Sequence, residues 1–484
     1  MKPDQRKTPL YDAILDFIGE DVTLFHIPSH KMGRAINPAW LEYAGEEIFK
    51  MDLSEVRGLD DLHAPHGAIL EAQSLAADAW SSRECFFLVN GTSGGIIAAV
   101  ASAAAEGDEL IVPRNVHKSV IYGLVISGAK PVYVNADIDR TLGLIGGLSP
   151  DAVSAVYDGH PGAKGLFCVS PTYHGICSDV KSLVSLTHAH GGIFIADEAH
   201  GNHTYFHPEL PEGALASGAD ISCQSTHKMS GSLTQSSMLH LKSDRVDRAR
   251  LTANLRLIQS TSPSYLLMAS LDMARSYIAL NGRDILGDVL ELSLSARAKI
   301  GGIPGMSVLG DEIIGESHIA ALDPVRIVIS ARDMGFEGYE LSRILRGEHS
   351  IEAEFADYYY CVCTMGLGTK SEDVNRLVSS LSEISGKYAG LRAPLTWEEE
   401  LPPLPPMMLT PRAAYFGRRT DIPWRDAKGR ICADMIVPYP PGIPAICPGE
   451  LITDEVWDYL NEMRIKKRHI HGFSGDHNDR VGVV

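Results

Sequence analysis

Seven short apolar runs alternate with helical patterns between about residue 84 and residue 240. Short apolar runs predict buried strands, and helices between them let neighbouring strands run parallel. The pattern therefore predicts an α/β fold in which helices cover both faces of a mostly parallel central sheet. The seven runs are 84–89, 109–112, 131–134, 165–170, 192–197, 219–224 and 236–241.

The length of 484 residues predicts two or three domains with sizeable cores. We expect an N-terminal segment, a large domain, a small α/β domain and a C-terminal domain. Their expected bounds are 1–65, 66–285, 286–395 and 396–484. A long helical pattern from 244 to 281 ends near Asn281 and Gly282 and leads out of the large domain.

The small domain is expected to contain two strands and two helices. Their predicted ranges are 325–330 and 358–364 for the strands, and 338–346 and 371–386 for the helices. The proline-rich stretch 401–406 predicts an extended linker. Residues 438–444 predict a rigid loop, because proline cannot lie inside a central strand.

Composition limits the partners and the compartment of the chain. The formal charge of −18 argues against a nucleic-acid partner, because phosphate binding depends on clustered Lys and Arg. No apolar stretch is long enough to span a membrane and the N-terminus has no secretory pattern, so a cytoplasmic protein is expected. Eight cysteines without a Cys-x-x-Cys pair indicate reduced thiols rather than disulfides or zinc. His469, His471 and His477 fit a polar tail better than a metal site, so no metal is expected.

Polar groups follow four of the predicted strands. In an open α/β sheet, ligands gather beyond the carboxyl ends of the strands, so these groups predict one shared site. They are the segments 90–95, 170–175 and 225–228, together with Asp197.

An apolar run that ends in Asp197 and a hydroxyl-flanked Lys228 suggest pyridoxal phosphate. That cofactor needs a lysine for its Schiff base and a carboxylate that keeps the pyridine nitrogen protonated. A solvated Asp and an ordinary surface Lys are the alternative if each residue is taken alone.

Two further motifs support the cofactor interpretation. Gly91, Thr92 and Ser93 open an apolar helix, where free N–H groups and hydroxyls favour a phosphate, although a simple capped turn has the same pattern. His117 could stack on the pyridine ring or be a helix cap. Ser225 and His227 flank the lysine and could add phosphate contacts.

Taken together, these motifs resemble the Orn/Lys/Arg decarboxylase family, major group, of fold type I pyridoxal phosphate enzymes. The resemblance covers nearly the whole chain. His26 to Gly33 is similar to the family's Pro-Gly-His-Lys-Gly-Gly opening, with Ser29 and Met32 as departures. The other matching segments are 52–63, 90–93, 114–119, 197–200, 225–228 and 439–444.

The resemblance implies a role for each motif residue. Lys228 would be the Schiff-base lysine, Asp197 the pyridinium partner and His117 the stacking histidine. Gly91, Thr92, Ser93, His200, Ser225 and His227 would complete the cofactor site. The resemblance also implies a homodimer, or a larger even homo-oligomer, with active sites at the subunit interface. The chain looks like the short branch of the family, in which arginine decarboxylases are prominent.

The expected reaction is decarboxylation of a basic amino acid: arginine to agmatine, with lysine and ornithine next. A distal cation needs an anionic partner, for which Glu55, Glu352 and Glu354 are candidates, followed by Asp357 and Asp434. Two alternatives stay open: a fold type I aminotransferase or other lyase, and a non-catalytic member of the fold. An arginine that clamps the substrate carboxylate would favour transamination, and the sequence leaves open whether Arg114, Arg256 or Arg412 does so.

Overall fold

A computed structural model describes residues 3–20, 22–396, 401–439, 442–476 and 478–484. The chain divides into two compact units, each made of two stretches of sequence. The first unit contains Met1–Ser102 and Ile195–Gly287, and the second contains Ala103–Phe194 and Asp288–Val484. The predicted domain bounds at 65, 285 and 395 stay a prediction.

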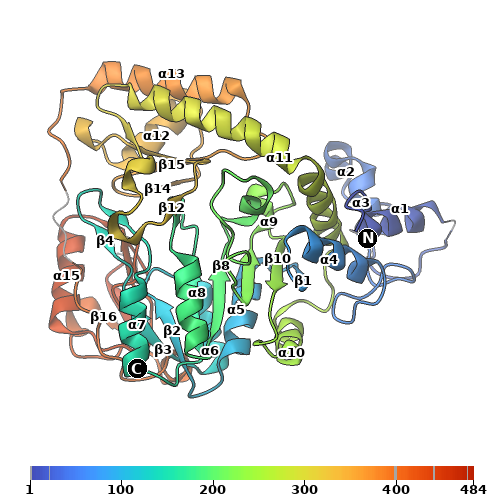
Figure 1. The fold of residues 1–484 in the computed structure, drawn as a ribbon, viewed down its shortest axis with the longest axis horizontal. Helices are drawn as coiled ribbons and strands as arrows, with labels where there is room; N and C mark the ends of the chain where they lie inside the picture. Colours follow the sequence, from blue (N-terminus) through green and yellow to red (C-terminus); the bar gives the residue numbers. More distant parts are fainter. Residues whose placement is uncertain (1–2, 21, 397–400, 440–441, 477) are drawn as a thin grey trace. The chain divides into compact units, whose positions relative to one another are not determined.

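The sheet of the first unit brings the first and last predicted runs together (Figure 1). β1 (Glu84–Leu88) pairs antiparallel with β10 (Ser237–Leu241), and β10 pairs antiparallel with β9 (Ile221–Gln224). β9 pairs parallel with β8 (Ile193–Asp197). The expected parallel arrangement is therefore interrupted at β10, which runs against both of its neighbours.

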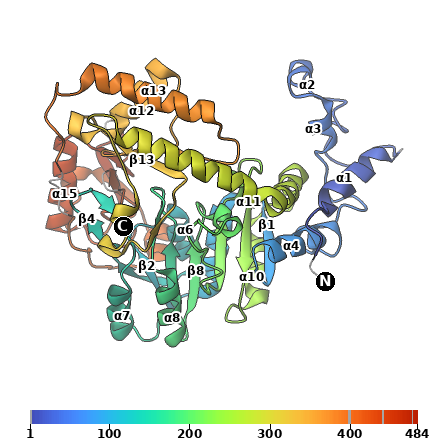
Figure 2. The ribbon, with the colours of Figure 1, turned by 45° about the horizontal axis from the view of Figure 1, so that its top comes forward.

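Helices of the N-terminal segment pack on the first unit. α1 (Pro9–Gly19) lies against α4 (Ala68–Ala79), as Figure 2 shows, and their apolar faces share one core with β1 and the start of α11 (Tyr265–Gly301). The buried Asp272 accepts a hydrogen bond of 3.0 Å from the Leu10 N–H and pairs with Arg275 at 2.5 Å. The hydrogen bond from Leu10 ties the start of the chain to α11. Two short helices, α2 (Pro38–Ala44) and α3 (Glu46–Lys50), lie between α1 and α4 in the sequence.

The single helix predicted from 244 to 281 is wrong. The structure has α10 (Arg248–Ile258) and then α11 (Tyr265–Gly301), with Pro263 between them, where the missing N–H breaks the helix. α11 also continues past Gly282, the expected end. A Cβ at Gly282 would lie 3.0 Å from the Cβ of Phe206, so glycine serves close packing here rather than termination.

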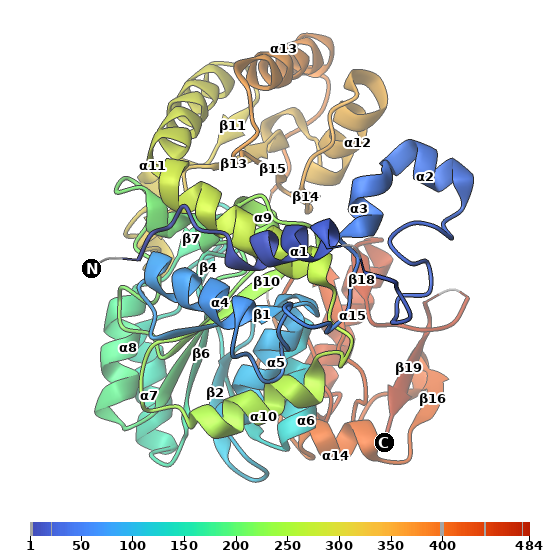
Figure 3. The same cartoon turned by 90° about the vertical axis from the view of Figure 1, so that its right-hand side faces the viewer.

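The sheet of the second unit is parallel. β2 (Glu109–Pro113) pairs with β3 (Lys130–Val134) and with β6 (Gly165–Val169). β8 begins in this unit, where the Ile193 N–H donates to the Lys164 carbonyl at 2.9 Å. α7 (Pro150–Gly159) and α8 (Val180–Ala189) lie side by side in Figure 3, and α6 is Lys118–Ser127. The short strands are β4 (Ile138–Asp139), β5 (Leu144–Ile145), β7 (Ile176–Cys177) and β12 (Ala321–Leu322).

The two strands and two helices expected in the small domain are present, and the strands belong to a second, antiparallel sheet. Its order is β11-β13-β15-β14, and α12 (Gly338–His349) and α13 (Ser371–Tyr388) follow in the predicted places. The strands are β11 (Ser307–Val308), β13 (Arg326–Ser330), β14 (Phe355–Ala356) and β15 (Cys361–Thr364). β15 begins later than predicted because Asp357 accepts the Tyr359 and Tyr360 N–H groups in a turn, at 2.8 and 2.7 Å.

The C-terminal part contains α14 (Pro411–Phe416), α15 (Asp454–Ile465) and two small antiparallel sheets. One pairs β16 (Thr420–Pro423) with β19 (Arg480–Val483), and the other pairs β17 (Val437–Tyr439) with β18 (His469–His471). β17 corrects part of the loop predicted at 438–444, since a two-stranded sheet tolerates proline at its edge. Residues 440 and 441 of that loop lie outside the described residues. Across the described helices, none is both long and apolar enough to cross a membrane.

Candidate active site

The first unit places a helix N-terminus beside the ends of two strands. α5 (Gly91–Ala103) begins at Gly91, whose φ of +68° suits glycine and poorly suits other residues. The turn brings Thr92 against the segment that follows β9. The first turn of α5 supplies backbone N–H groups without partners inside the helix.

Three hydroxyl groups meet at this point. Thr92 Oγ1 lies 2.5 Å from Ser225 Oγ and 2.6 Å from Ser237 Oγ, and Ser237 donates to the Gln224 carbonyl at 2.5 Å. All three residues are buried, whereas Ser93 is exposed. Thr92 and Ser225 thus lie together, as an anion site would require. Nothing in the sequence pointed to Ser237, because it opens the antiparallel strand β10 rather than following a strand end.

Asp197 ends β8 as a buried carboxylate, 4% exposed. Burial raises the pKa of Asp197, while the Ala199 N–H, 3.0 Å from Oδ1, and the positive charge of Lys228 act to lower it. An acid held in this way gains from a cationic partner, because a nearby positive charge stabilises its ionised form.

Lys228 lies in the short helix α9 (Thr226–Met229) and points its amine at His200. The distance from Lys228 Nζ to His200 Nε2 is 2.9 Å, and His200 is buried. His227 turns away from this contact, with Nδ1 2.7 Å from the Ser236 carbonyl. Lys228, His200 and Asp197 therefore belong to one unit, with a nucleophilic amine next to an imidazole.

These residues have the chemistry that pyridoxal phosphate requires. Lys228 offers an amine for its aldehyde, Asp197 offers a buried acid for its ring nitrogen, and the hydroxyls around Thr92 offer donors for its phosphate. The match to the cofactor rests on the kinds of chemical group that the first unit contains.

Glu198, next to Asp197, is held by a network of hydrogen bonds. It is 1% exposed and accepts hydrogen bonds from Tyr205 at 2.5 Å and from the Ala214 N–H at 2.7 Å. Ser222 and Gln224 of β9 also donate to it, at 2.5 and 3.0 Å. Glu198 thus ties the end of β8 to β9 and the segment around Ala214. The motif Asp-Glu-Ala-His did not by itself distinguish this supporting role.

His117 belongs to the second unit and caps α6. Its Nδ1 accepts the Ser119 N–H at 3.3 Å and lies 2.8 Å from Ser119 Oγ. The cap that the sequence left open is therefore present. Stacking of this ring on a cofactor stays a prediction.

The three arginines considered as carboxylate clamps all have partners within the protein. Arg114 is 1% exposed and forms two hydrogen bonds to Glu450, at 2.6 and 2.7 Å. Arg256 donates to the His63 carbonyl at 2.7 Å, and Arg412 donates to the Ile126 carbonyl at 3.1 Å. Arg114 is thus a buried structural cation in the second unit.

The candidate carboxylates for a substrate cation lie in different settings. Glu55 and Glu354 are exposed, and Glu352 is exposed and paired with Arg346 at 2.6 Å. Asp357 instead accepts from the buried His174 at 2.8 Å, and Asp434 pairs with Arg419 at 2.7 Å. The role of Glu55, Glu352 and Glu354 stays a prediction.

Comparisons with known proteins cover both ends of the chain. Residues 8–373 match the Orn/Lys/Arg decarboxylase major domain, and residues 398–479 match the C-terminal domain of the same family. An arginine decarboxylase of Halalkalibacterium halodurans is 40% identical over 461 residues, which cover 95% of this chain and 94% of that protein. An arginine decarboxylase of Bacillus subtilis is 39% identical, covering 94% of this chain and 93% of the relative.

Solved structures confirm the fold class. The lysine decarboxylase A of Pseudomonas aeruginosa superposes with a TM-score of 0.85 at 23% identity, covering 98% of this chain and 80% of that one. At this identity the likeness establishes the fold alone. Together with the two domain matches and the identity to the relatives from Halalkalibacterium and Bacillus, it shows that the chain belongs to the Orn/Lys/Arg decarboxylase family.

Proposed function

We propose that the protein is a pyridoxal phosphate-dependent decarboxylase that converts L-arginine to agmatine and CO2. The observation that carries this proposal is the cluster of Lys228, His200 and Asp197 in a member of the Orn/Lys/Arg decarboxylase family. Arginine is proposed ahead of lysine and ornithine because the relatives at 40% and 39% identity are named arginine decarboxylases.

Residues of the first unit would hold the cofactor. Thr92 and Ser225 would donate to the phosphate at the N-terminus of α5, helped by the Gly91 and Ser93 backbone and by Ser237. Lys228 would attach to the aldehyde carbon through Nζ. Asp197 would keep a proton on the ring nitrogen. The positive charge of that nitrogen would in turn stabilise the ionised form of the buried carboxylate.

The cofactor, when bound, supplies an electron sink for the negative charge left on Cα when CO2 departs. Lys228 is the residue proposed to return a proton to that carbon. His200 Nε2, 2.9 Å from Nζ, is placed to accept a proton from the amine and to hand one back. His117 is proposed to cover one face of the cofactor ring.

A visible absorption band tests the cofactor assignment directly. The purified protein supplied with pyridoxal phosphate should show the band of a lysine-bound cofactor, and Lys228→Ala should lose it. Lys242, which is not part of the cluster, provides a matched control: Lys242→Ala should keep the band. A wild-type protein that stays colourless would contradict the proposal and favour a non-catalytic member of the fold.

Product identification by mass spectrometry tests the reaction and the substrate. Incubation with arginine, lysine and ornithine in separate samples should yield agmatine, cadaverine or putrescine, with agmatine forming fastest. An oxo acid in place of CO2 and an amine would support transamination instead.

The substrate-side carboxylate is the least defined part of the proposal. Replacing Glu55, Glu352 or Glu354 by Gln should raise KM for arginine if that residue binds the guanidinium, with a smaller effect on kcat. A residue that serves the surface alone would leave both constants unchanged.

The proposal includes a cytoplasmic homodimer, or a larger even homo-oligomer, with active sites shared between subunits. The eight cysteines are free thiols, which suits a reducing compartment. Sedimentation of the protein would give the oligomer number. Mixing two inactive variants that recover activity together would show that the sites are shared.

A further inference from the structure

Two histidines of the second unit lie side by side on the strand β18. Residues two apart on a strand point to the same face, so His469 and His471 share one face of the strand. Pairing with β17 fixes their backbones, with His469 opposite Tyr439 and His471 opposite Val437. Both side chains are exposed, so a solute can reach them.

The two imidazoles approach at a distance typical of ligands on one metal ion. Their Nε2 atoms are 3.0 Å apart, and their ring planes are nearly perpendicular, at 87°. Two nitrogens at about 2.0–2.1 Å from a metal are about 2.9 Å apart at a right angle and about 3.3 Å apart in a tetrahedron. The observed spacing lies between these limits.

We propose that His469 and His471 form a two-imidazole chelating site for one divalent transition-metal ion of the Cu²⁺, Ni²⁺ and Zn²⁺ group. Nitrogen ligands of this kind suit these ions rather than Mg²⁺ or Ca²⁺, which prefer oxygen.

A metal binds the neutral form of an imidazole ring. In the metal-free pair, one Nε2–H donates to the other Nε2. On binding, that hydrogen moves to Nδ1 of its own ring and the metal takes its place, so no proton is lost.

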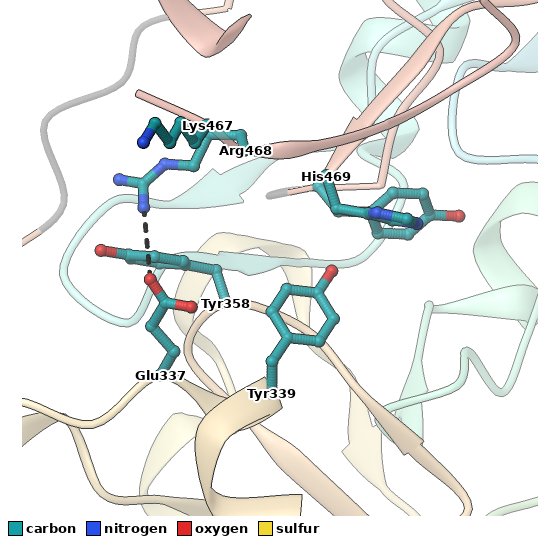
Figure 4. Close-up of a pocket in the computed structure, with 7 residues that line it drawn as sticks. Glu337, Tyr339, Tyr358, Lys467, Arg468 and His469 are labelled. Atoms are coloured by element: carbon teal, nitrogen blue, oxygen red, sulfur yellow. Dashed lines mark ion pairs between the residues drawn. The ribbon is translucent and has the colours of Figure 1, made fainter. Parts of the chain in front are cut away.

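A cavity borders His469, as Figure 4 shows, and its volume is about 280 Å³. The lining residues are Glu337, Tyr339, Tyr358, Tyr439, Lys467, Arg468 and His469. The described residues hold no group of three or more His, Cys, Asp or Glu side chains that could bind a metal, so water would complete the coordination.

Neighbouring charges set the strength of the site. Arg468 lies 3.6 Å from the centre of the Tyr358 ring and 3.9 Å from Glu337, and Lys467 lines the same cavity. Together with Lys118, these cations repel the positive charge of a metal ion. Glu337 is the one carboxylate among the described residues that line the cavity. We therefore expect the ion with the highest intrinsic affinity, Cu²⁺, to bind most tightly.

Titration of the full-length protein with Cu²⁺ tests the proposal, followed by electron paramagnetic resonance. The expected result is one tight site with two nitrogen ligands. His469→Ala and His471→Ala should each weaken it roughly tenfold or more, because the second imidazole of a chelate binds at a high effective concentration. His471→Asn keeps a hydrogen-bonding side chain but removes the ligand nitrogen, so it should behave like His471→Ala.

His66→Ala is the matched control, because His66 is an exposed histidine outside the pair, with 81% of its side chain accessible. It should leave the affinity for Cu²⁺ unchanged, and circular dichroism should show each variant folded. The proposal fails if the double variant His469→Ala/His471→Ala binds Cu²⁺ as tightly as the wild type. It also fails if the signal of two nitrogen ligands persists in His471→Asn, since His471 would then not be a ligand.

Discussion

The buried ion pair between Arg114 and Glu450 gives the sharpest stability prediction. Both side chains are 1% exposed, and the carboxylate receives two hydrogen bonds from the guanidinium, at 2.6 and 2.7 Å. Burial opposes the charge of Arg114, but Cys447 and Glu450 raise its pKa overall, so the guanidinium stays protonated. Glu450 also accepts the Cys447 N–H at 2.6 Å.

Glu450→Ala would leave the guanidinium buried, with the Pro444 carbonyl at 2.8 Å and the Tyr133 ring at 4.6 Å as its remaining partners in the described chain. Breaking a buried pair in this way costs about 3–5 kcal/mol. A typical domain is stable by only about 5–15 kcal/mol, so much of the stability of the second unit would be lost.

Urea unfolding followed by tryptophan fluorescence measures this loss, because Trp424 and Trp457 belong to the same unit as the pair. The double variant Arg114→Met/Glu450→Leu removes both charges and should recover most of the stability, since apolar pairs of similar volume replace buried ion pairs at little cost. A loss below about 1 kcal/mol in Glu450→Ala, or an equal loss in the double variant, would refute the reasoning.

Three further predictions concern the first unit. Asp272→Asn should speed trypsin cleavage before Leu10 by at least about fivefold, because the hydrogen bond and ion pair of Asp272 anchor that segment. Glu198→Gln should flatten the stability of the protein against pH. Burial raises the pKa of Glu198 above 4.5, so between pH 4.5 and its folded pKa the folded state binds more protons and loses stability as pH rises. Thr92→Val should weaken binding of pyridoxal phosphate about fivefold, measured by absorbance titration, since one hydroxyl is worth about 1 kcal/mol.

Each of these three predictions has its own control. Asp16 lies on the exposed face of α1, so Asp16→Asn should leave the trypsin rate unchanged. Unfolding temperatures measured from pH 4 to 8 would contradict the second prediction if wild type and Glu198→Gln keep parallel slopes. Thr92→Ser retains the hydroxyl and should bind the cofactor like the wild type.

The sequence predicted local elements better than it predicted their pairing. Apolar runs mark strands because burial is a local property of a run, so β2, β6 and β8 lie where expected. Strand direction depends on distant partners, and nothing near Ser237 shows that β10 runs antiparallel to β1 and β9. Pro263 marks the break before α11. The helical patterns on both sides of it nevertheless led to the prediction of one continuous helix.

In the candidate site too, some residues could be recognised from the sequence and others only from the fold. Residues that act through their own chemistry, such as Lys228 and Asp197, stand out in the sequence because few residue types can replace them. Supporting residues do not stand out, since Ser237 and Glu198 gain their roles from partners that only the fold brings near. The Arg114–Glu450 pair joins residues from distant parts of the chain, so an arginine considered as a substrate clamp is instead a structural cation.

The interleaved order of the two units has a consequence for synthesis on the ribosome. Thr92 emerges early, but its hydroxyl partners Ser225 and Ser237 follow only after the stretch 103–194, which belongs to the other unit. The nascent chain must therefore keep the edge of β1 and the apolar face of α5 unpaired while that stretch is translated. Chaperones bind apolar surfaces that are exposed in this way during folding. The yield of folded protein is therefore expected to depend on chaperones more than its equilibrium stability would suggest.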